Sequence, residues 1–108
     1  MSRRAITDQE WFFYIVRCRD DSLYSGITID LETRLREHNK GTGAKYTSGR
    51  RPVTLVYCER YGNVSQARKR EEQIKGWPKT KKERLIVVYS STSLGINESF
   101  SHRSSIRA

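Results

Sequence analysis

Two tyrosines, an arginine, a histidine and a glutamate stand where their side chains could act together. Tyr14 and Tyr24 fall in two successive strand-like segments, Arg34 and His38 lie four residues apart in a helical pattern, and Glu71 lies in a later helical pattern. A tyrosine hydroxyl beside an arginine can hold a water molecule or act as a base. A carboxylate on a buried face needs a cation, a metal ion or hydrogen-bond donors. The set is therefore a candidate for a polar site that holds a water molecule and a cation.

Arg34 and His38 lie at the edge of the apolar stripe that Leu31 and Leu35 define on their helix. At about 100° per residue, Arg34 lies roughly 60° from Leu31, and His38 roughly 20° from it on the same side. Arg36 instead lies on the solvent face. The alternatives are an arginine whose stem covers the edge of the core and a histidine with a structural role.

Glu71 falls between Ala67 and Ile74 on the inward stripe of the later helix, whereas Glu72 points away. Burying a carboxylate costs free energy unless a partner compensates its charge. Two interpretations stay open. Glu71 is either one half of a buried ion pair with an arginine, for which Arg34 is a candidate, or a metal ligand at the floor of a cleft.

The segments that position these residues follow the order β-β-α-β-α-α. Apolar and β-branched runs predict strands over residues 11–18, 23–28 and 53–61. Helices are predicted over 30–40, with Asp30 as N-cap and Gly41 after the end, over 65–75, stopped by Gly76 and Pro78, and over 81–88, after a capping box of Thr80 and Glu83. Residues 41–52 hold three glycines and a proline and predict a loop. The order indicates a small three-stranded sheet, at least partly antiparallel, packed by helices.

The 108 residues are enough for one modest domain. We expect a flexible segment over 1–10, the domain over 11–89, and a disordered serine-rich tail over 90–108. No apolar run is long enough for a membrane span or a signal peptide, which predicts a cytoplasmic protein without a membrane partner. Cys18 and Cys58 fall in strands without zinc-site spacing, so we expect two buried free thiols.

The net charge of +9 is concentrated in the middle of the chain. Residues 34–84 carry fifteen basic and five acidic side chains, whereas residues 1–33 carry four basic and six acidic ones. A basic surface of this kind attracts polyanions, and nucleic acid is the expected partner. The candidate contacts are Lys45, Tyr46, Thr47, Arg50 and Arg51 in the loop, and Arg70 in the later helix. The alternative is a solvated basic loop.

The order of these residues resembles the GIY-YIG nuclease superfamily. The resemblance covers residues 11–86 and rests on Tyr14, on Tyr24 and Gly26 in "YSG", and on Arg34, His38 and Glu71. Two longer blocks, "FYIVRCRDDSLYSGITIDLETRLREHNKGTGAKYTSGRRPVTLVY" and "ARKREEQIKGW", are similar to a small single-domain bacterial subfamily described as of uncertain function. Phe12 stands where the superfamily has glycine, and Ser25 where it has isoleucine. Neither change removes a proposed chemical group.

The resemblance implies a fold, a metal ion and a reaction. The fold is of the α+β class (α/β in broad terms), a three-stranded antiparallel sheet flanked by helices. The catalytic residues implied are Tyr14, Tyr24, Arg34, His38 and Glu71, with Glu71 as ligand of one divalent ion, Mg²⁺ or Mn²⁺. The reaction implied is hydrolysis of a phosphodiester bond, with no small-molecule cofactor.

These features favour a metal-dependent DNA endonuclease or nickase that acts as a monomer or weak dimer, in DNA repair or recombination. The chain shows no clear recognition helix, so we expect it to read the shape of DNA rather than its sequence. RNA is the alternative substrate. Two other functions stay open: a nucleic-acid-binding module with a vestigial or partner-dependent site, and a protein-interaction domain that works beside a repair enzyme. Which tyrosine acts as the base also stays open.

Overall fold

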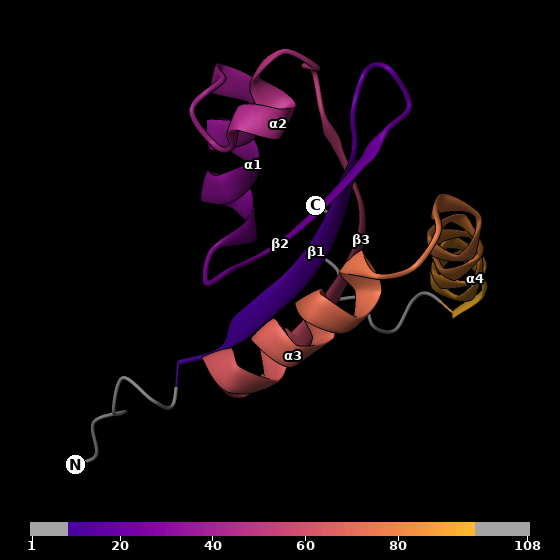
Figure 1. Cartoon of the computed structure of the whole chain (residues 1–108). Helices are drawn as coiled ribbons and strands as arrows, with labels where there is room; N and C mark the ends of the chain where they lie inside the picture. The colour runs from indigo at the N-terminus through magenta and orange to yellow at the C-terminus, as the bar shows by residue number, and fades with distance from the viewer. Residues whose placement is uncertain (1–8, 97–108) are drawn as a thin grey trace. The chain divides into compact units, whose positions relative to one another are not determined.

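The structure, a computed structural model, describes residues 9–96 (Figure 1). Its elements are β1 (Trp11–Arg17), β2 (Leu23–Thr28), α1 (Leu31–Lys40), α2 (Lys45–Ser48), β3 (Thr54–Tyr61), α3 (Val64–Lys75) and α4 (Lys79–Ile96). The chain divides into two compact units, one that ends at Gly76 and one that begins at Trp77. The three predicted strands and the two helices that carry the candidate site are confirmed.

The first unit is built on a three-stranded antiparallel sheet with β1 in the centre. Tyr14 of β1 stands opposite Gly26 of β2 and Cys58 of β3. Residues 13–16 of β1 are all buried. Because successive side chains of a strand point to opposite faces, both faces of the sheet are covered. The expected fold class, with an antiparallel sheet and flanking helices, is confirmed.

Different helices cover the two faces of the sheet. On one face, Tyr14 and Val16 form a core with Val53, against which Leu31 and Leu35 of α1 pack. The opposite face is covered by α3. Phe13 packs edge-on against Tyr57 there, with ring centroids 6.2 Å apart. Glu59, which stands opposite Phe13, binds Arg70 of α3. Figure 1 shows α1 and α2 close together, and α3 lying along the strands away from those two helices.

Side-chain caps fix where α1 and α3 begin. The Asp30 carboxylate accepts a hydrogen bond from the Thr33 backbone N–H at 3.1 Å, and Asn63 accepts one from the Gln66 N–H at 2.9 Å. Such caps satisfy N–H groups that have no partner within the helix. Gly41 follows α1 with a φ of 92°, a left-handed conformation that favours glycine. The predicted cap and stop of α1 are therefore both present.

Three local predictions were wrong. The segment over 41–52 is not only a loop, because it contains the short helix α2. The first backbone hydrogen bonds of α4 run from Lys81 and Lys82 to the Pro78 carbonyl, so Thr80 lies inside the helix and is not its N-cap. The helix also continues beyond Ser90 to Ile96, where serine-rich composition predicted disorder. Serine has only a middling helix propensity, and a helix already formed propagates at low cost. The remaining parts of the predicted flexible segment and tail, residues 1–8 and 97–108, lie outside the described residues.

Two further expectations concern the thiols and membranes. Cys18 and Cys58 are both free, but only Cys18 is buried, and Cys58 is half-buried. Within residues 9–96, no helix combines the length and hydropathy that crossing a membrane requires.

Ser25 has a buried hydroxyl without a hydrogen-bond partner among the described residues. A buried polar group without a partner costs free energy. We therefore expect Ser25→Ala to raise the free energy of unfolding by about 1 kcal/mol in chemical denaturation. The control is Ser22→Ala, because the Ser22 hydroxyl donates to Asp20 at 2.6 Å. Equal or lower stability of Ser25→Ala relative to the wild type would contradict this expectation.

Candidate active site

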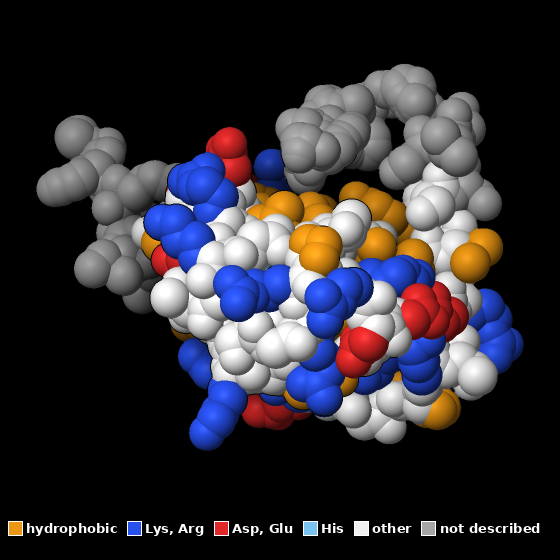
Figure 2. Space-filling view, turned by 90° about the horizontal axis from the view of Figure 1, so that it is seen from above, with side chains coloured by type: hydrophobic (Ala, Val, Ile, Leu, Met, Phe, Trp, Pro, Cys, Tyr) orange, Lys and Arg blue, Asp and Glu red, His pale blue; other side chains and the backbone are white. Residues whose placement is uncertain are grey.

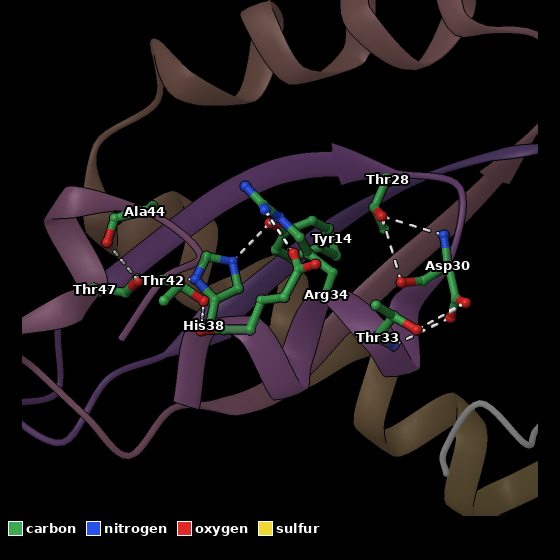
Figure 3. Close-up of polar contacts among 10 residues, drawn as sticks. Tyr14, Thr28, Asp30, Thr33, Arg34, His38, Thr42, Ala44 and Thr47 are labelled. Atoms are coloured by element: carbon green, nitrogen blue, oxygen red, sulfur yellow. Dashed lines mark hydrogen bonds and ion pairs between the residues drawn. The ribbon is translucent and has the colours of Figure 1, made fainter. Parts of the chain in front are cut away.

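Tyr14, His38 and Thr47 form a buried chain of hydrogen bonds at the centre of the candidate site (Figure 3). The Tyr14 hydroxyl lies 2.8 Å from His38 Nε2, and the Thr47 hydroxyl lies 2.8 Å from His38 Nδ1. His38 and Thr47 are fully buried, and Tyr14 is 2% exposed. The chain joins β1 to α1 and α2, with Tyr14 and His38 24 residues apart in sequence and His38 and Thr47 nine apart. The histidine expected at the edge of the core is therefore inside it.

The position of the Tyr14 side chain explains why β2 carries a glycine, Gly26, opposite it. A Cβ atom at Gly26 would lie 2.6 Å from the Tyr14 hydroxyl oxygen and 2.9 Å from Cζ. The tyrosine side chain therefore passes directly over the backbone of β2, and only glycine leaves it room.

Substitution of Gly26 is expected to disturb this packing. Gly26→Ala should lower the free energy of unfolding by about 1–3 kcal/mol, the usual cost of overpacking a core. In a Tyr14→Phe background the loss should be smaller, because the closest contact, at 2.6 Å, is removed. A double-mutant cycle measured by thermal and chemical unfolding tests this. Gly49→Ala is the control, since a Cβ atom there meets nothing within 4 Å. Equal losses in both backgrounds would count against direct contact with the hydroxyl.

Arg34 joins this chain from the first turns of α1. Its Nε donates to the Tyr14 hydroxyl at 3.4 Å, and its Nη1 donates to Glu37 at 2.9 Å. The side chain is 30% exposed. Among the described residues these contacts use two of the five N–H groups of the guanidinium, so three remain for a ligand. Partial burial acts to lower the pKa of Arg34, but its hydrogen bonds to Tyr14 and Glu37 outweigh this and raise the pKa. The group is a fixed positive charge beside a buried hydroxyl.

The surroundings shift the pKa values of the two groups that could exchange a proton. Burial raises the pKa of Tyr14. Arg34 opposes this rise, and the charges of Tyr24 and Glu71 add to it. Burial lowers the pKa of His38, and so does the charge of Arg34, whereas Glu37 acts in the opposite direction. His38 is therefore neutral at pH 7, and Tyr14 keeps its proton.

The lowered pKa of His38 predicts how stability changes with pH. The unfolded chain binds a proton at this residue below its ordinary pKa of 6.5, while the folded chain resists protonation. Stability from this group is complete above about pH 6.5 and is lost as the pH falls toward the lower folded value. Urea unfolding of a His102→Gln variant, at pH values from about 7.5 to 5, isolates the remaining histidine. Constant or rising stability over that range would contradict the prediction.

Tyr24 borders the chain through aromatic contacts. Its ring meets the His38 ring edge-on, with centroids 5.4 Å apart, and stacks on the Tyr46 ring at 5.7 Å with planes 22° apart. Arg50 lies over the Tyr46 ring, with its Cζ 4.0 Å from the centroid, and Arg50 Nε donates to Asp20 at 3.1 Å. These contacts hold the segment that carries α2 against the site. Both tyrosine rings thus meet the His38 ring edge-on, and of the two it is Tyr14 whose hydroxyl lies within hydrogen-bond distance of a His38 nitrogen.

Glu71 is a half-buried carboxylate on α3, which packs against the strands of both site tyrosines. Its side chain is 17% exposed, and its Oε2 lies 3.3 Å from Lys75 Nζ. The arginine pairing considered from the sequence is not present, because Arg34 binds Glu37 instead. Glu71 acts on Tyr14 through its charge.

The donor set at Glu71 is compatible with a hard cation. Across the residues that the structure describes, no group of three or more His, Cys, Asp or Glu side chains could hold a metal ion. A single carboxylate is enough for Mg²⁺, which keeps several of its water ligands. The ion would have to compete with Lys75, whose side chain is 54% exposed.

Five of the six candidate nucleic-acid contacts, those from Lys45 to Arg51, fall into two groups. Lys45, Tyr46 and Arg51 are exposed. Thr47 is buried on His38, and Arg50 is engaged by Tyr46 and Asp20. Arg51 also lines a surface hollow of about 450 Å³ whose other residues are Arg19, Asn39, Ser48, Gly49 and Pro52. Arg19 was missed by the sequence reasoning, because its proximity to Arg51 depends on the path of the chain. Figure 2 shows Lys and Arg side chains spread over one face, with fewer acidic ones between them.

Arg70 belongs to a separate cluster around Glu59. Its guanidinium contacts the Glu59 carboxylate three times, at 2.9, 3.2 and 2.9 Å. The hydroxyls of Tyr57 and Tyr61 also donate to Glu59. Burial, followed by its bond to Glu59, raises the pKa of Tyr61 to about 12. Arg70 therefore links α3 to β3, and no sequence pattern indicated this partner.

The comparison with known proteins agrees with this geometry. Residues 10–84 match the family model described as the GIY-YIG catalytic domain. The chain belongs to the GIY-YIG family. A UPF0213 protein of Staphylococcus aureus (strain Mu3 / ATCC 700698) is 55% identical over 75 residues, which are 69% of this chain and 92% of the relative.

Two solved structures are also similar to this GIY-YIG protein. The solution NMR structure of the protein EF2693 from E. faecalis is 38% identical and has a TM-score of 0.54, over 80% of this chain and 92% of that one. The solution NMR structure of the UPF0213 protein BH0048 from Bacillus halodurans is 37% identical with a TM-score of 0.49, over 73% of this chain and 84% of that one. The family match and the Staphylococcus aureus relative confirm the resemblance to a small bacterial subfamily, and the names of these relatives assign no activity.

Proposed function

We propose that this GIY-YIG protein is a divalent-metal-dependent endonuclease or nickase that hydrolyses phosphodiester bonds in DNA. One observation carries the proposal: Arg34 contacts Tyr14, and Tyr14 contacts His38. These contacts join a partly exposed cation to a hydrogen-bonded pair of side chains that can accept a proton. Phosphodiester hydrolysis needs a cation that stabilises the negative charge on the phosphate and a group that accepts a proton from the attacking water.

Each residue has a role that follows from its surroundings. The three N–H groups that Arg34 has left bind the phosphate oxygens and stabilise their growing charge. A tyrosine hydroxyl, with His38 behind it, orients the attacking water. Glu71 would hold one Mg²⁺ or Mn²⁺, which when bound polarises the phosphate and stabilises the leaving oxygen.

The substrate is expected to be recognised by its backbone. The exposed Lys45 and Arg51, with Arg19 in the same hollow as Arg51, suit phosphate contacts rather than base edges. Specificity then comes from DNA shape, ends or flaps, as an enzyme of repair or recombination requires. One site per chain predicts one nick per encounter.

The test uses labelled single-stranded, duplex, flap and branched DNA, together with the matching RNA. Each is incubated with Mg²⁺, with Mn²⁺ or with a chelator, and Glu71→Ala purified in parallel controls for contaminating nucleases. We expect metal-dependent cutting by the wild type alone, strongest on a branched or flapped substrate. Equal cutting by both preparations, or cutting in the chelator, would overturn the metal-dependent reaction.

One observation favours a second function, a nucleic-acid-binding module with a vestigial or partner-dependent site. Glu71 already has a cationic partner in Lys75. Tight, salt-sensitive DNA binding without cleavage of any substrate would establish that function in place of the first.

A further inference from the structure

Thr47 has the surroundings of a residue that acts on the active site from inside the fold. The sequence places it among basic residues of a segment expected to face nucleic acid, yet it is fully buried. Its hydroxyl lies 2.8 Å from His38 Nδ1 and 3.2 Å from the Ala44 carbonyl oxygen (Figure 3). A buried hydroxyl between an imidazole and a carbonyl restricts which of the two imidazole nitrogens carries the proton.

The available protons decide the direction of the hydrogen bonds. Neutral His38 has one N–H, and Tyr14 and Thr47 have one O–H each. If Thr47 donates to Ala44, His38 Nδ1–H donates to Thr47, and Tyr14 donates to the bare Nε2. In the reverse direction Tyr14 would accept from both His38 and Arg34, which would leave its own buried proton without an acceptor among the described residues. Only the first direction gives every proton a partner.

We propose that Thr47 is a positioning residue that holds His38 as the Nδ1–H tautomer, so that His38 Nε2 receives the Tyr14 proton when Tyr14 takes one from the attacking water. The proposal rests on the proposed nuclease function. It also assigns the base role to Tyr14 rather than Tyr24, because Tyr24 meets His38 by a ring contact. A tyrosine that passes its proton on need not ionise beforehand.

The atoms of this step balance. The water oxygen forms a bond to phosphorus while one water proton moves to the Tyr14 oxygen and the Tyr14 proton moves to His38 Nε2. The ester bond to the leaving oxygen breaks, and that oxygen takes a proton from solvent. His38, now an imidazolium, returns a proton to solvent. The products are a phosphate monoester and a free hydroxyl.

The chain around Thr47 is built to keep it in place. A Cβ atom at Gly43 would lie 2.7 Å from His38 Nδ1 and 2.8 Å from its backbone N and Cα, so only glycine lets this segment lie on α1. Farther along, Arg50 Nη1 donates to the Tyr46 carbonyl at 2.7 Å, and Arg50 is held by Asp20. The segment is therefore anchored on both sides of Thr47.

Within residues 9–96, few charged and titratable groups face His38. Arg34 and Glu37 act on it from α1, Tyr14 from β1 and Tyr24 from β2. Arg34 favours the neutral ring and Glu37 opposes it. The acid limb of the kcat profile should therefore fall below the ordinary histidine pKa of 6.5.

The test compares Thr47→Val, Thr47→Ser and the control Thr42→Val, because Thr42 is exposed and its hydroxyl donates to the Glu37 carbonyl at 3.4 Å. Long-range ¹H–¹⁵N NMR of the metal-free protein, with His102→Gln for assignment, reads the His38 tautomer without any substrate. We expect Nδ1–H in the wild type, Thr47→Ser and Thr42→Val, and loss of that preference in Thr47→Val. In cleavage assays Thr47→Val should lose about 10²-fold in kcat with little change in KM, and Thr47→Ser should restore it.

Two results would overturn the proposal: an Nε2–H tautomer in the wild type, or Thr47→Val that keeps both the tautomer and kcat. A loss of kcat in Thr47→Val with an unchanged tautomer would also overturn it, since Thr47 would then act by another route. If the wild type cleaves no substrate, the nuclease function fails, while the NMR spectra still decide whether Thr47 sets the tautomer.

Discussion

Glu71→Ala is expected to abolish metal-dependent cleavage while the fold and DNA binding persist. Glu71 is the carboxylate through which the site would hold its ion, and the described residues offer no cluster of three ligands to replace it. Loss of a group that stabilises transition-state charge typically costs about 10²–10³ in kcat. The ion pair with the half-exposed Lys75 contributes little to stability. Removing the carboxylate should therefore affect catalysis far more than unfolding.

Three measurements separate the effects of this substitution: single-turnover cleavage at saturating Mg²⁺ and Mn²⁺, DNA binding by fluorescence anisotropy, and thermal unfolding. Glu72→Ala is the matched control, because Glu72 is the next residue of α3 and is exposed. Full activity of Glu71→Ala, or an equal loss in Glu72→Ala, would remove Glu71 from the metal site. Equal loss of binding and cleavage would indicate a role in holding DNA.

Arg34→Lys should lower kcat by about 10²–10³-fold, with a much smaller effect on DNA affinity. Lysine keeps the positive charge and can still pair with Glu37, but it loses the planar fork that binds two phosphate oxygens at once. It also loses the Nε–H that donates to the Tyr14 hydroxyl at 3.4 Å. The expected loss therefore reports geometry rather than charge.

Arg36→Lys is the matched control for Arg34→Lys. Arg36 lies on the same helix but is exposed, and it forms a surface ion pair with Glu32 at 3.7 Å. Multiple-turnover kinetics give kcat and KM for both variants, and anisotropy gives Kd. Unchanged kcat in Arg34→Lys would show that a point charge suffices there. A comparable loss in Arg36→Lys would point to a general effect on α1.

The increase in kcat on addition of metal should differ between Arg34→Lys and Arg36→Lys. Arg34 and the ion at Glu71 would stabilise the same phosphate, so their effects should not add. Arg34→Lys combined with Glu71→Ala is therefore expected to lose less than the product of the two single losses.

Sequence patterns predicted those parts of the site that depend on neighbours along the chain. The Asp30 cap and the Gly41 stop fix α1 through hydrogen bonds within a few residues, and both are present in the structure. The helical period distinguished Glu71 from Glu72, and their exposure differs accordingly. The serine-rich end of α4 shows the limit of composition, because its extension to Ile96 depends on helix propagation.

Tertiary structure decided which side chains meet. The register of β1 with β2 places the Tyr14 hydroxyl over Gly26, and the path of residues 41–52 buries Thr47 on His38 while it leaves Arg51 exposed. The sequence by itself determined the elements and the residue types, since caps, stops and periodicity act over one or two turns. The contacts of His38 and Arg34 with Tyr14, and of Arg70 with Glu59, were decided only by the fold. A side chain binds the group that lies nearest in space, whatever its distance along the chain. Tyr14 is 20 residues from Arg34 and 24 from His38, and Glu59 is 11 residues from Arg70. Sheet register and loop path bring these pairs together.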